Sequence, residues 1–145
     1  MAFDKSFVES NRASSCRMRA LTERLSDEEL RRPLGKHWTV SAALAHLAFW
    51  DLRVMHLIDA TERNGKLCAP EIDIAINDIA LPLWAALPPR EAARIAVETA
   101  EALDKRLENF APGLLEAIYA YNERWVMRAS HRNAHLDAIE EALKR

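Results

Sequence analysis

The spacing of apolar residues is what most constrains the fold of this chain. Over long stretches they recur three and four residues apart, which is the period of an amphipathic α-helix. β-branched and aromatic residues never gather into the alternating runs that mark strands. Only 3 of the 145 residues are glycine, the ordinary residue that costs a helix most, and alanine and leucine dominate the apolar set. We therefore predict an all-α fold, as one domain over residues 1–145.

Caps and chain breakers divide the pattern into helices. Thr39 and Asn122 are suitable N-caps, Gly65 a stop, and Pro88-Pro89 a favourable first turn. The long helices are expected over four segments: Asp4 to Leu25, Thr39 to Asn64-Gly65, Pro88-Pro89 to Pro112-Gly113, and Glu123 to about Leu143. Shorter helical pieces are expected at a Ser26–Glu29 capping box, over Glu71–Trp84 with a weak point near Pro82, and over Leu114–Tyr119.

Four long helices with short extra pieces predict a four-helix bundle. The connection from Gly65 to Pro88 is long enough to run the length of the bundle, so the second and third long helices can be parallel, as in an up-down-down-up topology. The predicted core stripe of the first helix is Phe3, Phe7, Ser10, Ser14, Met18, Leu21 and Leu25, and that of the second is Val40, Leu44, Leu47, Val54 and Ile58.

Charge and composition argue against several classes of protein. The formal net charge is −2 and no basic stripe is visible, so we expect no nucleic-acid partner. No apolar run approaches the roughly 20 residues that cross a bilayer, and the amphipathic start does not resemble a signal peptide. We therefore expect a cytoplasmic protein without membrane contact. Cys16 and Cys68 are too few for a disulfide framework.

Histidines offer the best candidate for chemistry. His131 and His135 lie one turn apart on the last predicted helix, so both imidazoles can reach one divalent ion. Arg132 stands where a zincin helix has its glutamate, so that enzyme class is excluded. The spacing does not choose a third ligand among the remaining histidines, His37, His46 and His56. A chance pair that merely favours the helix dipole is the competing interpretation.

Other polar and aromatic residues have two interpretations each. The tryptophans are either core residues or the walls of a substrate pocket, and they are Trp38, Trp50, Trp84 and Trp125. Trp50 and Arg53 share a helix face with His46, so we predict that they contact substrate. Asp51 can orient a ligand, but an exposed carboxylate is the favoured interpretation. Asp73, Asn77 and Asp78 form a polar patch whose default role is capping or solvation.

Two motifs resemble a known family. Trp38-Thr39-Val40 with Leu44-Ala45-His46-Leu47 and Trp50-Asp51 is similar to the second-helix motif of the DinB-like superfamily, and His131-Arg132-Asn133-Ala134-His135-Leu136 to its last-helix motif. The resemblance implies an up-down-down-up four-helix bundle, often a homodimer. It also implies a zinc or nickel ion held by one histidine of the second helix and two of the last, which here are His46, His131 and His135.

The resemblance extends to function. Members include bacillithiol S-transferases and mycothiol-dependent maleylpyruvate isomerase, whose N-terminal domain is the part similar to this chain. The implied function is therefore that of a metal-dependent enzyme acting on a small molecule, with a low-molecular-weight thiol as cosubstrate. A hydrolase could use the same three histidines to activate water. The alternative from another class is a non-enzymatic, stress-associated bundle that binds a metal or a small ligand.

Overall fold

Helices make up most of residues 4–144, which are the residues that the computed structural model describes. The long helices are α1 (Phe7–Arg24), α3 (Val40–Asn64), α5 (Pro89–Glu108) and α7 (Ala129–Leu143). The connections contain α2 (Asp27–Leu30), α4 (Ile76–Ala86), α6 (Pro112–Tyr121), the 3-10 turn η1 (Glu123–Trp125), and the strands β1 (Pro33–Leu34) and β2 (Trp38–Thr39). The all-α prediction is confirmed, apart from one short hairpin. Within the described part of the chain, no helix is both long and apolar enough to cross a membrane.

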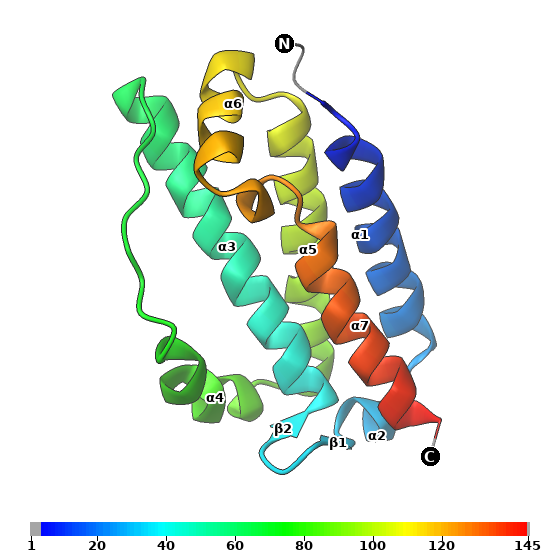
Figure 1. The fold of residues 1–145 in the computed structure, drawn as a ribbon. Helices are drawn as coiled ribbons and strands as arrows, with labels where there is room; N and C mark the ends of the chain where they lie inside the picture. Colours follow the sequence, from blue (N-terminus) through cyan, green and yellow to red (C-terminus); the bar gives the residue numbers. More distant parts are fainter. Residues whose placement is uncertain (1–3, 145) are drawn as a thin grey trace.

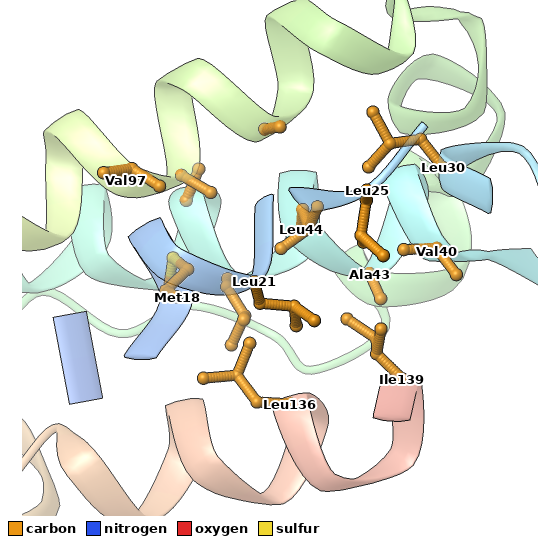
Figure 2. Close-up of a cluster of buried hydrophobic side chains, with 14 of the residues drawn as sticks. Met18, Leu21, Leu25, Leu30, Val40, Ala43, Leu44, Val97, Leu136 and Ile139 are labelled. Atoms are coloured by element: carbon orange, nitrogen blue, oxygen red, sulfur yellow. The ribbon is translucent and has the colours of Figure 1, made fainter. Parts of the chain in front are cut away.

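The four long helices lie along one another (Figure 1). α3 packs against α5 and α7, and α1 packs against the same two helices. Their apolar stripes meet in a shared core, in which Met18 and Leu21 of α1 approach Leu44 of α3 and Leu136 of α7 (Figure 2). Phe3, the first residue of the predicted α1 stripe, lies outside the described residues.

Local sequence signals fix several helix ends as expected. The Thr39 hydroxyl accepts a hydrogen bond from the Ala42 N–H, and Gly65 closes α3 in the left-handed conformation with φ 66°. Ser26 forms the predicted capping box with Glu29. The hairpin of β1 and β2, with Gly35 at φ 69°, was not predicted because two-residue strands are too short to show an alternating pattern. It places Trp38 beside the start of α3.

Several predicted boundaries are wrong. Helix α4 begins at Ile76 and not at Glu71, and it continues past Pro82 to Ala86. Helix α5 ends at Glu108, before Pro112. The predicted break near Tyr121 is confirmed. Asn122, however, caps only the η1 turn, and α7 begins at Ala129, six residues later than the predicted start at Glu123.

The start of α7 is set by a residue of α1. The side-chain oxygen of Asn11 accepts hydrogen bonds from the N–H groups of Arg128 (2.8 Å) and Ala129 (3.0 Å). Its amide nitrogen donates to the Val126 carbonyl at 2.7 Å. Asn11 therefore caps α7 from another helix, which no local pattern around residue 122 could indicate.

A buried network of charges joins the long helices. The Arg132 side chain of α7 is fully buried and donates hydrogen bonds to Asp51 of α3 at 3.0 Å and to Asp104 of α5 at 2.9 Å. Arg128, also buried, donates to the other oxygen of Asp51 at 2.9 Å. Asp51 is only 1% exposed, so its predicted exposure is wrong. Two arginines thus balance two aspartates within this network.

Replacing Arg132 by methionine tests this network. R132M leaves two buried carboxylates without a cation, so we expect the free energy of unfolding to fall by about 3–5 kcal/mol in chemical denaturation. The control R17M breaks the surface pairs of Arg17 with Asp137 and Glu140 and should cost far less, because solvent screens them. Equal losses in the two variants would contradict a structural role for the buried network.

Candidate metal centre

Three histidines from two helices converge on one point. His46 projects from the second turn of α3, and His131 and His135 from successive turns of α7. Their potential ligand atoms all lie within 4.8 Å of one another, and His46 Nε2 is 3.2 Å from His131 Nε2. Two imidazole nitrogens on one tetrahedral zinc ion, each about 2.0–2.1 Å from it, are about 3.3 Å apart. The three histidines can therefore hold a metal ion, and among the described residues His37 and His56 do not belong to this group.

The protonation state of the histidines suits metal binding. Burial, with a smaller contribution from His135, lowers the pKa of His46 to about 4. Burial and the neighbouring charge of Arg128 lower the pKa of His131 to about 2, and burial also lowers the pKa of His135. All three imidazoles are thus neutral near pH 7 and present lone pairs, as metal ligands must.

The metal-free hydrogen bonds fix which nitrogens carry protons. Arg128 Nη2 can only donate, so its 3.3 Å contact makes His131 Nδ1 an acceptor and puts the proton of His131 on Nε2. That proton points at His46 Nε2, which leaves the His46 proton on Nδ1, a buried atom with no hydrogen-bond partner among the described residues. A metal held through both Nε2 atoms would require the His131 proton on Nδ1, where that ring could no longer accept a hydrogen bond from Arg128.

Aromatic rings enclose His46. The rings of Trp38 (β2) and Trp84 (α4) each lie 5.4 Å from the imidazole in edge-on geometry, and Trp50 lies 6.5 Å away. These contacts leave His46 6% exposed, whereas His131 and His135 are half-buried. His46 is thus packed among these rings, and on the open side of the site all three histidines line the wall.

That open side is a cavity of about 1130 Å³, large enough for a small-molecule substrate. Its wall includes the three histidines, the predicted contact residues Trp50 and Arg53, and also Trp38 and Trp125. Trp84 packs in the core behind the site, so the tryptophans divide between the two interpretations. Sequence reasoning missed Tyr121 and Arg128 as lining residues, because α6 and the start of α7 were not placed correctly.

The three residues of the polar patch in the connecting segment have different roles in the structure. The Asp73 side chain accepts a hydrogen bond from the Ala75 N–H, so it shapes the turn that leads into α4. Asn77 accepts a hydrogen bond from the Trp50 indole at 2.8 Å, which fixes that ring at the cavity wall. Asp78 is exposed. The capping role predicted for this patch is therefore not confirmed, since α4 has no side-chain cap, and Asn77 supports the site.

Comparisons with known proteins add no assignment: no protein-family model, no curated protein and no solved structure matches the chain. The resemblance to the DinB-like superfamily therefore stays a prediction.

Metal analysis tests the centre. Protein purified without an affinity tag and incubated with zinc or nickel should retain about one ion per chain after desalting. The double variant H131A/H135A should retain almost none, and H56A, which changes an exposed histidine of α3, should behave as the wild type. Equal metal content in the wild type and the double variant would disprove the site.

The pKa values predict how the metal-free protein responds to acid. Unfolded histidines have a pKa near 6.5, so below that pH the unfolded chain binds protons that the folded chain excludes. The free energy of unfolding, measured with a chelator present, should therefore fall as pH is lowered from about 6.5 towards 4, by up to about 1.4 kcal/mol per pH unit for each histidine. H131Q/H135Q should show a shallower slope, and an unchanged slope would contradict the burial of neutral histidines.

Proposed function

We propose that this chain is a metal-dependent enzyme, a thiol-dependent S-transferase or a related thiol-using catalyst. Its zinc or nickel ion is held by His46, His131 and His135. The observation that carries the proposal is the position of three neutral imidazoles at the wall of a cavity of about 1130 Å³. Three protein ligands leave a coordination position open, which is the pattern of a catalytic site rather than a structural one.

The chemistry follows from the donor set. A divalent ion at this site lowers the pKa of a thiol, so that a nucleophile is available near neutral pH. The chain supplies the three ligands, and Trp50 and Arg53 contact the substrate. These two residues and the three histidines line the same cavity, so a substrate bound there would lie close to both.

Thiol chemistry suits the site better than hydrolysis. A water nucleophile needs a general base, but the nearest carboxylate of α3, Asp51, is fully engaged by Arg128 and Arg132. The acidic residues of the cavity wall, Glu71 and Asp73, are exposed. A thiol ionises more readily than water and needs less help from a base. The same lack of a base favours the second candidate, a non-enzymatic protein that binds a metal or a small ligand.

We also propose membership of the DinB-like superfamily, with a four-helix bundle of up-down-down-up topology. Support comes from Figure 1, in which α1 and α7 run towards the β1–β2 end of the molecule while α3 and α5 run away from it. The connection after α3 returns along that helix to α4, as two parallel neighbouring helices require. Homodimer formation, which the resemblance implies, stays a prediction that light scattering can test.

A thiol-consumption assay tests the proposed function. The zinc- or nickel-loaded protein is mixed with an aromatic halide electrophile and, in turn, glutathione, cysteine, bacillithiol and mycothiol, and the free thiol is measured over time. At least one thiol should be consumed, and H46A should lower that rate by about 100-fold or more, because it removes a ligand of the ion. H56A is the matched control. Loaded protein that consumes no thiol would favour the binding protein instead.

A further inference from the structure

Arg53 differs from the other arginines that pack around α3. Arg106 of α5 pairs with Asp59 and Glu62, and Arg128 pairs with Asp51. Within the described residues, Arg53 has no carboxylate within ion-pair distance. Its Nη2 donates to the Pro70 carbonyl at 2.5 Å, and its Nη1 is buried without any hydrogen-bond partner. The guanidinium therefore keeps a full charge and unused donors at the cavity wall, which is unfavourable unless an acceptor arrives from elsewhere.

The surroundings hold this guanidinium in place. It stacks over the Trp125 ring, 5.0 Å from the ring centre, and the Pro70 contact fixes its other side. An oriented planar guanidinium matches the two oxygens of a carboxylate, which it binds through two parallel hydrogen bonds. A carboxylate that binds both nitrogens must displace the Pro70 contact and turn the guanidinium, because Nη1 is buried.

With a divalent ion on the histidines, the charge of the cavity would also favour an anion. Three arginines line it, Arg53, Arg124 and Arg128, against two acidic residues, Glu71 and Asp73. Asp51 neutralises Arg128, so the charges of Arg53 and Arg124 are balanced by those of Glu71 and Asp73. A divalent ion on three neutral histidines adds positive charge with no ligand to offset it. The most complementary ligand carries negative charge and approaches both the ion and Arg53.

The spacing along α3 sets the length of that ligand. Arg53 follows His46 by seven residues, which is about 10 Å along the helix, and Trp50 lies between them on the same face. We propose that the substrate of this site is an elongated carboxylate. Its carboxylate binds Arg53, its apolar middle lies beside Trp50, and its reactive end lies at the three histidines. The position of the reactive end rests on the proposed function, whereas the carboxylate subsite stands on Arg53 itself.

Matched probes test the subsite. The full-length protein, loaded with cobalt(II), is titrated with ω-mercaptooctanoate and with ω-mercaptooctanol, which differ only in the group that faces Arg53. Tryptophan fluorescence gives the dissociation constants, and the sulfur-to-cobalt absorption band shows whether the thiol reaches the metal. We expect the carboxylate to bind about tenfold more tightly than the alcohol. Equal affinities would overturn the proposal.

Variants of α3 assign the effect to one residue. R53Q should abolish the preference for the carboxylate, whereas R63Q, the same change at an exposed arginine of the same helix, should keep it. Should R53Q fail to fold, R53K decides: it keeps the charge but loses the paired donors, so the preference should fall several-fold. An unchanged preference in either Arg53 variant would contradict the proposal.

The two readouts separate the two claims. A cobalt–sulfur band without a carboxylate preference would overturn the Arg53 subsite and leave the proposed thiol chemistry intact. A carboxylate preference that R53Q removes, without that band, would support the subsite and contradict the proposed use of a thiol.

Discussion

The ion pairs of Arg132 are the interaction on which the arrangement of this molecule depends. A fully buried guanidinium is tolerated only with its charge balanced, and Asp51 and Asp104 balance it from two other helices. Sliding α7 by one residue would leave buried charges unpaired, so the network fixes the register of α7 against α3 and α5. His131 precedes Arg132 directly, and His46 lies five residues before Asp51. The register that satisfies the charges therefore also brings the histidines together.

Much of the fold follows from local signals, and the misplaced start of α7 shows why other parts do not. The Thr39 hydroxyl begins α3 by accepting from the Ala42 N–H, and Gly65 ends it in the left-handed conformation, so the sequence around them was sufficient to predict its bounds. The start of α7 depends instead on Asn11, more than a hundred residues away, and the local cap at Asn122 was misleading. Tertiary contacts of this kind leave no periodic trace near the boundary they set.

The site was predictable in part. Spacing was enough to pair His131 with His135, but the third ligand depends on how α3 and α7 pack, and only the family resemblance selected His46. The burial of Asp51 did leave a signal, since it fills the gap between Leu47 and Val54 on the predicted core stripe of α3. A carboxylate at such a position needs a buried cation. Arg132 left a similar signal, because it lies four residues before the core residue Leu136 and so on the buried face of α7.

This register brings three imidazoles within reach of one ion, and X-ray absorption spectroscopy of the protein loaded with one equivalent of zinc can detect that ligand set. We expect three imidazole nitrogens at about 2.0–2.1 Å, with the remaining coordination supplied by water or another light ligand. A spectrum with fewer than three imidazoles, or with oxygen ligands alone, would contradict it.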